Sequence, residues 1–487
     1  MNTWHEEQLL IDGKLTPAVG GATYENVNPA TEAVLGVAAD ASIGDARQAI
    51  AAARRAFDTT DWSRNPAKRA AALRQLSAKL TEHLDELREL TIAEVGAPRL
   101  LTSGPQLAGP IADLNYFADL AESYDWERSL GQASPMGIAS DRVVRREAVG
   151  VVGAITPWNF PHQINFAKIG PALAAGATIV LKAAPDTPWC AALVGKVIAE
   201  ETDIPPGVIN IITGTDHQLG AQLSADPRVD MVSFTGSTAT GKKVMAAAAE
   251  NLTQVFLELG GKSAFIVLDD ADLNTACSMA AINVVTHAGQ GCAIPTRLLV
   301  PRPQLQAAID ATRGTMAALG ANDPNEPGTM CGPLISQRQR ARVEDYLKLA
   351  VEEGGTIECG GGRAADRKRG YFIEPTLISG LSNSSRVAQE EIFGPVLVII
   401  PHDGDDDAIA IANDSPYGLS GAVWGTDPDR VEKVVAGVRT GTLGVNGGIW
   451  YSADVPFGGY KASGIGREMG VAGFEEYLET KAVAYRA

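Results

Sequence analysis

The stretch Ala148-Val149-Gly150-Val151-Val152-Gly153-Ala154-Ile155 is apolar and strand-like, and it begins the region that decides the fold. Similar runs follow at residues 178–181, 208–212, 229–234, 254–257 and 264–268. Segments of helical composition, such as 189–201 and 238–250, separate most of these runs. The alternation predicts a parallel sheet with helices on both faces, and ligands of such sheets bind beyond the carboxyl ends of the strands. An α/β domain that binds no nucleotide fits the same pattern.

The regions on either side are less regular. Residues 1–60 are expected to form short strands and turns. Residues 68–94 carry leucines at helical spacing, which predicts one helix with a buried stripe: Leu73, Leu76, Leu80, Leu84, Leu87 and Leu90. A helical stretch after Asn274 leads to Cys292, and α/β alternation continues to about residue 445. The tail, 479–486, alternates as a half-buried edge strand does, and such strands are often paired with another subunit.

Length, charge and cysteine content restrict the class of protein. A chain of 487 residues is too long for one hydrophobic core, so two or three domains are expected. The net charge of −17 argues against a nucleic-acid surface, and no run reaches the roughly 18 apolar residues of a membrane span. Five cysteines without CxxC spacing indicate neither a disulfide framework nor a zinc site. Residues 1–7 lack the basic and apolar regions of a secretion signal, so a reduced, cytoplasmic location is expected.

One cysteine and one carboxylate indicate covalent chemistry. Cys292 ends Gly289-Gln290-Gly291-Cys292, and Glu258 lies in Leu257-Glu258-Leu259-Gly260-Gly261-Lys262. A thiolate can attack a carbonyl carbon, and a carboxylate can activate the water that releases the product. Free cysteines are usually buried structural residues, but the flanking glycines leave this thiol approachable.

Other segments at the ends of predicted strands each have two readings. Thr156-Pro157-Trp158-Asn159-Phe160-Pro161 fixes an amide between prolines, as an oxyanion donor or as a rigid turn. Gly236-Ser237-Thr238 opens a helix, where it can bind phosphate or simply cap the helix. Lys182 is either a ligand for ribose or phosphate or a solvated lysine. Glu390-Glu391-Ile392-Phe393-Gly394-Pro395 is either a ligand-binding turn or a junction.

Together with Pro456-Phe457-Gly458-Gly459-Tyr460-Lys461, these segments occur in the order found in the aldehyde dehydrogenase superfamily, which the chain resembles over nearly its whole length. The resemblance implies an α/β fold with a Rossmann-like, parallel-sheet cofactor domain at 1–125 and 148–260. It also implies an α/β catalytic domain at 261–460 and a small β oligomerisation element at 126–147 and 461–487. A homodimer or homotetramer would follow.

The resemblance also implies site roles. Cys292 would be the nucleophile, Asn159 and the Cys292 N–H the oxyanion hole, Glu258 the base for hydrolysis, and Lys168 with Glu468 a proton relay. The residues implied in NAD or NADP binding are Thr156, Trp158, Lys182, Pro185, Gly236, Ser237, Leu259, Glu391 and Phe393.

One position departs from the family pattern. NAD-preferring members carry a glutamate three residues after the lysine, where it binds the ribose 2′-hydroxyl, and here Pro185 stands there, followed by Asp186. The loss of that carboxylate makes NADP admissible, and the alternative is that Asp186 substitutes for the glutamate.

The substrate is predicted only as a class. Residues next to the motifs that are expected to line the substrate tunnel are Phe160, His162, Ile294, Trp450, Tyr451 and Phe457. Their character favours an uncharged aliphatic or aromatic aldehyde.

Three other functions compete. CoA-acylating relatives generally lack the deacylating glutamate, whereas Glu258 is present. A cysteine hydrolase requires a histidine base, and none of the six histidines lies in a recognisable catalytic motif. A non-catalytic homologue is expected to lose Cys292 or Asn159, and both are present.

Overall fold

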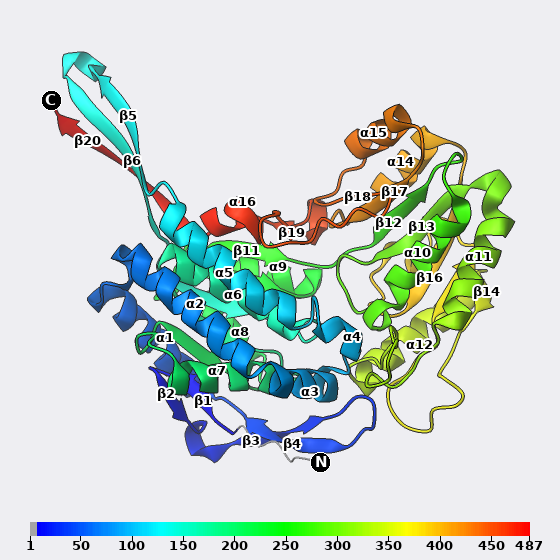
Figure 1. Ribbon diagram of the computed structural model, residues 1–487, viewed down its shortest axis with the longest axis horizontal. Helices are drawn as coiled ribbons and strands as arrows, with labels where there is room; N and C mark the ends of the chain where they lie inside the picture. Colours follow the sequence, from blue (N-terminus) through cyan, green and yellow to red (C-terminus); the bar gives the residue numbers. More distant parts are fainter. Residues whose placement is uncertain (1–6) are drawn as a thin grey trace.

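The first of two lobes is built on an eight-stranded sheet. A computed structural model describes residues 7–487 (Figure 1); residues 1–6, which bear on the expectation about a secretion signal, lie outside it. Five parallel strands form the middle of the sheet in the order β11-β10-β7-β8-β9: Gln254–Glu258, Met231–Thr235, Val151–Ile155, Thr178–Lys182 and Ile209–Ile212. The antiparallel edge strands are β19 (Gly464–Ile465), β1 (Leu9–Ile11) and β2 (Lys14–Thr16).

Helices cover both faces of this sheet, as the alternation predicted. Val152 and Leu181 point to a core that includes α2 (Pro66–Glu82), α5 (Ala108–Ser123), α6 (Pro161–Ala175) and α7 (Trp189–Glu201). Val151 and Val180 point the opposite way, to α1 (Ile43–Thr59), α8 (Gln218–Ala225) and α9 (Thr238–Ala249). Successive residues of a strand face opposite sides, so each strand contributes to two cores.

Two expectations for the first hundred residues were wrong. Residues 43–59 form α1 and not strands or turns, since Ser42 and Asp45 make a reciprocal capping box ahead of an alanine-rich run. The leucine stripe lies on two helices, α2 and α3 (Leu84–Val95), which meet at His83. The stripe itself is buried at five positions and partly buried at the sixth, Leu84. Short α4 (Arg99–Thr102) follows, and the hairpin of β3 (Thr23–Val27) and β4 (Val34–Ala39) lies along the lower edge in Figure 1.

The second lobe holds a seven-stranded sheet in the order β14-β15-β16-β13-β12-β17-β18. Its strands are Thr356–Cys359, Thr376–Ser379, Val396–His402, Pro295–Pro301, Ser263–Val267, Gly421–Trp424 and Gly444–Val445. All neighbours are parallel except β14, which is antiparallel to β15. The helices of this lobe are α10 (Leu273–Val285), α11 (Leu305–Ala318), α12 (Gln337–Glu352), α13 (Arg386–Gln389), α14 (Asp405–Asn413) and α15 (Pro428–Gly437).

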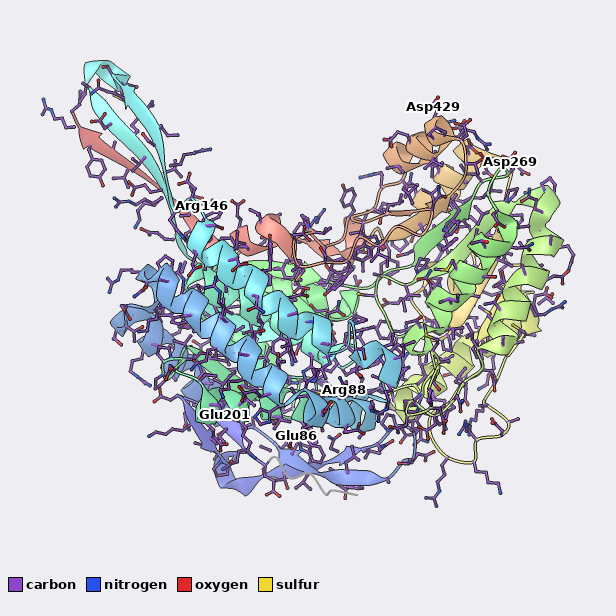
Figure 2. All side chains as sticks on the ribbon, in the orientation of Figure 1. Glu86, Arg88, Arg146, Glu201, Asp269 and Asp429 are labelled. Atoms are coloured by element: carbon purple, nitrogen blue, oxygen red, sulfur yellow. The ribbon has the colours of Figure 1, made fainter. Side chains whose placement is uncertain are left out.

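A three-stranded arm projects from the first lobe (Figure 1). It consists of β5 (Glu127–Ala133), β6 (Ser140–Ala148) and β20 (Leu478–Arg486), in the order β20-β6-β5. Figure 2 shows Arg146 at the base of the arm, where its guanidinium donates to the Tyr124 hydroxyl at 3.3 Å and lies 3.4 Å from the Glu475 carboxylate. The arm is thereby fixed to α5 and to α16 (Gly470–Glu475).

The tail is a strand, but it is not half-buried in the single chain. β20 pairs with β6 of its own chain, from Leu478 opposite Ala148 to Arg486 opposite Ser140. Between its ends only Val483 is shielded, because no second layer covers the arm. In the part of the chain from residue 7 onward, no helix is long and apolar enough to cross a membrane.

Candidate active site

The predicted catalytic residues surround one cavity between the two sheets. Asn159 and Glu258 follow β7 and end β11 of the first sheet, whereas Cys292 precedes β13 of the second. Together with Glu468 they line a cavity of about 790 Å³. The carboxyl ends of the parallel strands in the first sheet meet at this edge, which is where ligands of such sheets bind.

Two glycines let the chain carrying Cys292 fit tightly. A Cβ on Gly289, whose φ is +69°, would lie 2.1 Å from the Gly394 carbonyl oxygen. A Cβ on Gly261 would meet the Cys292 carbonyl oxygen at 2.4 Å. The thiol is half-buried and lines the cavity, so it is approachable as its flanking glycines predicted. Burial raises the pKa of the Cys292 thiol well above its usual range, and the charge of Glu258 raises it further.

The Asn159 side chain is fixed by its surroundings. Its Nδ2 donates to the Gln290 backbone carbonyl at 2.8 Å, and the backbone carbonyl of Asn159 accepts from Gln106 Nε2 at 2.9 Å. Gln290 is held in turn, because its side chain donates to the carbonyls of His287 and Pro333. A primary amide has two N–H donors, so Asn159 keeps one for a ligand. A donor held in this way can stabilise a developing oxyanion without reorganising.

Glu258 is a buried carboxyl with no hydrogen bond. It is 1% exposed, and neither carboxyl oxygen has a partner within residues 7–487. Burial raises its pKa well above the usual range, and the charge of Glu468 adds to this rise, whereas Lys168 and Arg467 oppose it. A carboxylate with a raised pKa is a stronger base, which suits the activation of water.

Lys168 and Glu468 form a buried ion pair across the first lobe. Lys168 Nζ lies 3.1 Å from Glu468 Oε1 and donates to Ser233 Oγ at 3.1 Å. The same ammonium lies 5.0 Å from the centre of the Phe256 ring. The two residues are 300 positions apart in the sequence, and the fold brings them together beside Glu258, as the resemblance implied.

Several candidate cofactor residues lie at the strand ends of the first sheet. Thr156 Oγ1 is buried without a hydrogen-bond partner within residues 7–487. Lys182 ends β8 and is 5% exposed, and burial lowers its pKa to about 8. Ser237 caps α9 by accepting from Thr240 N at 3.3 Å, while the N–H of Gly236 donates to the Glu258 carbonyl. The remaining N–H groups at the start of α9 are free to bind phosphate, so a capping role of Ser237 is compatible with a phosphate site at the same helix start. The Thr156 hydroxyl, the Lys182 amine and the N–H groups at the start of α9 are the kinds of group that bind the ribose and phosphates of a dinucleotide.

A second group of candidate cofactor residues lies at the passage between the sheets. Glu391 Oε1 accepts from the Gly261 N–H at 3.0 Å, and burial raises its pKa to about 6. The Phe393 and Trp158 rings meet edge to face, with centroids 5.4 Å apart. Leu259 is buried and its N–H donates to the Ser463 carbonyl at 2.9 Å.

The structure also locates the acid beside Pro185. Pro185 is half-buried in the turn after β8, and Asp186 follows it. Burial raises the pKa of Asp186, and the charges of Arg338 and Lys182 oppose this rise. Its carboxylate lies 3.9 Å from the Arg338 guanidinium. Asp186 is therefore within electrostatic reach of Lys182.

Five of the six predicted tunnel residues line the cavity: Phe160, Ile294, Trp450, Tyr451 and Phe457. Trp450 and Phe457 stack with centroids 5.4 Å apart. The prediction that His162 lines the tunnel was wrong. This histidine is 0% exposed, its Nε2 lies 3.0 Å from the Thr91 hydroxyl, and burial lowers its pKa to about 3. On α6 the neighbours Gln163 and Ile164 face the cavity, and His162 lies on the opposite side against α3.

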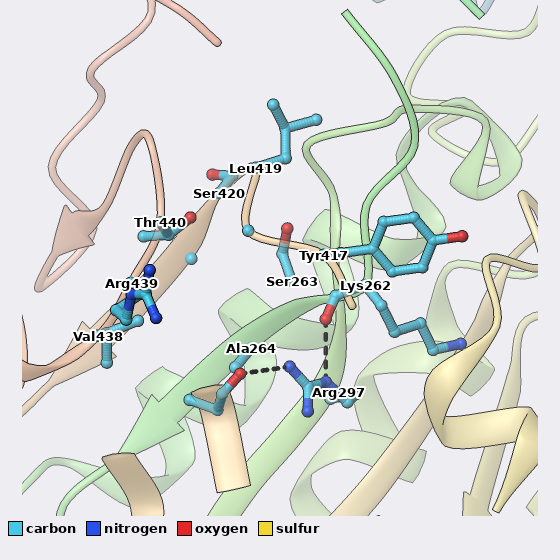
Figure 3. Close-up of a pocket in the computed structure, with 13 residues that line it drawn as sticks. Lys262, Ser263, Ala264, Arg297, Tyr417, Leu419, Ser420, Val438, Arg439 and Thr440 are labelled. Atoms are coloured by element: carbon cyan, nitrogen blue, oxygen red, sulfur yellow. Dashed lines mark hydrogen bonds between the residues drawn. The ribbon is translucent and has the colours of Figure 1, made fainter. Parts of the chain in front are cut away.

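Sequence reasoning missed the contribution of α5, from which Gly109, Pro110 and Asp113 line the cavity. No motif marks them, but their spacing is that of one helix face. A separate cavity of about 20 Å³ lies beside Arg297 (Figure 3). Arg297 donates there to the carbonyls of Lys262 and Ala412, so it joins the backbone of neighbouring segments.

Comparisons of the sequence and of the structure with known proteins all point to the same family. A model of the aldehyde dehydrogenase family matches residues 16–483. The chain is 42% identical to a 3-succinoylsemialdehyde-pyridine dehydrogenase of a Pseudomonas species over 98% of each chain. Its structure is similar to an NAD⁺ complex of aldehyde dehydrogenase from Bacillus cereus, with a TM-score of 0.94, 36% identity and coverage of 99% of this chain and 97% of that one. It is similar to Mycobacterium tuberculosis aldehyde dehydrogenase complexed with NAD⁺, with a TM-score of 0.94, 42% identity and coverage of 98% and 97%.

Proposed function

Because the chain belongs to the aldehyde dehydrogenase family and is an NAD(P)-dependent oxidoreductase acting on aldehydes, we propose that Cys292 is its nucleophile and a free carboxylic acid its product. The observation that carries the proposal is the convergence of Cys292, Asn159 and Glu258 on one cavity from two different sheets. The three residues supply a nucleophile, an oxyanion donor and a base.

The first step is attack of the Cys292 sulfur on the aldehyde carbon. Burial disfavours the thiolate, so the site must accept the thiol proton. Of the carboxyls that act on this thiol, Glu258 exerts the largest electrostatic effect, which makes it the group suited to take that proton. The thiohemiacetal oxyanion is then held by the Asn159 amide and the backbone N–H of Cys292.

The second step removes a hydride from the carbon bonded to sulfur. The bound nicotinamide supplies the acceptor for that hydride. Lys182 and the start of α9 would hold ribose and phosphate, and Glu391 with the Trp158 and Phe393 rings would hold the rest of the dinucleotide. Asn159 keeps the carbonyl oxygen oriented throughout.

The third step is hydrolysis of the Cys292 thioester. Glu258 accepts a proton from water, which attacks the acyl carbon, and the sulfur leaves as thiolate. The buried Lys168–Glu468 pair next to Glu258 can pass that proton on. A deacylating base within the site favours release of acid over transfer to CoA, the closest competing reaction.

The cofactor preference is proposed to be relaxed between NAD and NADP. Pro185 offers no carboxylate to a ribose 2′-hydroxyl and no repulsion to a 2′-phosphate. The charge of Asp186 acts on Lys182, and it would oppose the negative charge of a 2′-phosphate. Failure to detect NADP turnover beside normal NAD turnover would contradict relaxed use.

The remaining assignments are also proposals. The stacked rings of Trp450 and Phe457 support an aldehyde with an aliphatic or aromatic body. The separate sheets support a cofactor domain at 1–125 and 148–260 and a catalytic domain at 261–460. The exposed arm of β5, β6 and β20 supports the proposed oligomerisation element at 126–147 and 461–487 and a homodimer or homotetramer, whereas β19 and α16 in the second range pack on the first lobe. The cytoplasmic location stays a prediction.

A panel of aliphatic and aromatic aldehydes, assayed in parallel with NAD and NADP, tests the proposal. Cys292→Ala is the blank, and Cys359→Ala, a half-buried cysteine on β14, is the matched control. We expect reduced nicotinamide to form with the wild type and the control but not with the blank. Product analysis should give free acid with or without CoA. Activity retained by Cys292→Ala, or an acyl-CoA product, would reject the mechanism.

A further inference from the structure

The wall of the cavity contributed by α5 carries one acid, Asp113. It follows Gly109 and Pro110 by about one helical turn, so all three lie on the face of α5 that lines the cavity. The proposed chemistry does not use this carboxyl, which is attached to the opposite lobe from Cys292.

Asp113 differs from the other acids of its helix. Asp119 and Glu122 both accept from the Arg74 guanidinium at the protein surface. Asp113 makes no hydrogen bond or ion pair with any side chain between residues 7 and 487. Partial burial alone raises its pKa to about 6, so the carboxyl is partly desolvated and no protein group compensates its charge. It is still ionised for the most part at neutral pH.

Asp113 is the uncompensated acid of this cavity. Of the other two carboxyls, Glu468 pairs with Lys168 at 3.1 Å and Glu258 has a pKa raised by burial, which disfavours its charge. None of the described lining residues is lysine, arginine or histidine, so the wall at Asp113 favours a cation over an anion. Tyr451 feels the charges of both Asp113 and Cys292, so its ring lies within electrostatic reach of the acid and the nucleophile.

Aromatic faces complete the surroundings. Trp450 stacks on Phe457 at 5.4 Å and meets Tyr451 at 6.1 Å between ring centroids, and all three line the cavity. Such faces attract an ammonium ion through the ring quadrupole and at the same time accept an apolar spacer.

We propose that Asp113 binds a protonated amine at the far end of the substrate, so that the preferred substrates are aldehydes carrying an ammonium group beyond an apolar spacer. The inference rests on the proposed function, whose uncharged aldehyde it extends with a cationic end. An unpaired, half-buried carboxylate discriminates among ligands, because an uncharged isostere leaves it uncompensated and an anion repels it.

Three para-substituted benzaldehydes of similar shape test the inference. The dimethylaminomethyl compound carries a protonated amine, the 2-methylpropyl compound is its uncharged isostere, and the carboxymethyl compound is an anion. We expect kcat/KM to be at least about tenfold higher for the cation than for the isostere, and lowest for the anion. A factor of ten corresponds to about 1.4 kcal/mol.

Asp113→Asn removes the charge and keeps the shape. It should reduce the preference for the cation by about tenfold or more and leave kcat/KM for the isostere within about twofold. Asp119→Asn, the same change on the same helix outside the cavity, should leave all three values unchanged. Equal kcat/KM for cation and isostere in the wild type, or a preference that survives in Asp113→Asn, overturns the inference.

A binding measurement separates this inference from the proposed function. N,N-Dimethylbenzylammonium has no aldehyde, so its affinity by calorimetry does not depend on turnover. We expect it to bind the wild type and to lose about tenfold or more in affinity with Asp113→Asn. Binding without turnover of any aldehyde would reject the proposed function alone. Turnover of the isostere without ammonium binding would reject the role of Asp113 alone.

Discussion

Replacing Lys168 by methionine removes the cation from a buried pair and leaves Glu468 without its partner. The two side chains are 0% and 6% exposed, and their charged atoms lie 3.1 Å apart. Unit charges at that separation attract by about 5 kcal/mol at an effective dielectric constant of about 20. Loss of one partner of a buried pair typically costs about 3–5 kcal/mol, because the other charge stays buried. We expect a destabilisation of this size for Lys168→Met.

A double-mutant cycle measures the pair itself. The variants are Lys168→Met, Glu468→Gln and the two combined, and denaturant unfolding gives the free energy of each. The combined variant should be more stable than the sum of the single changes predicts, by about 2 kcal/mol or more. Lys79→Met, which breaks a 2.9 Å pair with exposed Glu82, is the control and should cost about 1 kcal/mol or less. A coupling energy below about 0.5 kcal/mol for the buried pair would refute the reasoning.

Four further outcomes are expected. Glu258→Gln should lower steady-state turnover by about 10²–10⁴-fold and still give a burst of reduced nicotinamide in stopped flow, slower than in the wild type because Glu258 also takes the thiol proton; a burst slowed as much as the steady state, or no burst, would argue against a separate role in deacylation. Asn159→Ala should cost about 10²–10³-fold in kcat with little change in thermal stability, and a smaller loss would remove it from the oxyanion hole. Lys168 lowers and Glu468 raises the pKa of Glu258, so Lys168→Met should move the acidic limb of the kcat–pH profile to higher pH and Glu468→Gln to lower pH; unshifted limbs would mean that the pair does not act on the base. The pKa of Lys182 is about 8, so its cation is lost as pH rises through that value, and the KM for NADP should increase between pH of about 7 and 9; a flat KM would separate this lysine from the phosphate.

The parts of the site that lie at strand ends could be predicted from the sequence. Glu258 and Lys182 are the last residues of β11 and β8, and Asn159 follows β7 by four positions. Apolar runs fix where such strands end, and parallel strands bring those ends to one edge. The 238–250 helix was predicted to within one residue for the same reason, because Ser237 marks its start.

Residues placed by packing between distant helices could not be predicted. His162 and Gln163 are adjacent in sequence, yet only the latter reaches the cavity, since the direction of α6 against α3 decides which face is inside. Asp113 approaches the site only through the packing of α5 on α6, which leaves no local pattern. The α1 helix is different, because the capping box of Ser42 and Asp45 is visible in the sequence and was overlooked.

The chain is synthesised from its N-terminus, which gives the β11–β19 pairing a consequence for when the active site is completed. Glu258 pairs with Gly464, and Glu468 lies only four residues further on, so the environment of the base is completed by a segment that is synthesised long after Glu258 itself. Cys292 emerges long before that segment, and domains tend to fold as they appear. A nascent or C-terminally truncated chain therefore holds the thiol without the finished machinery that acts on aldehydes. The three proposed steps therefore become possible together only when residues 464–468 have joined the first sheet beside Glu258.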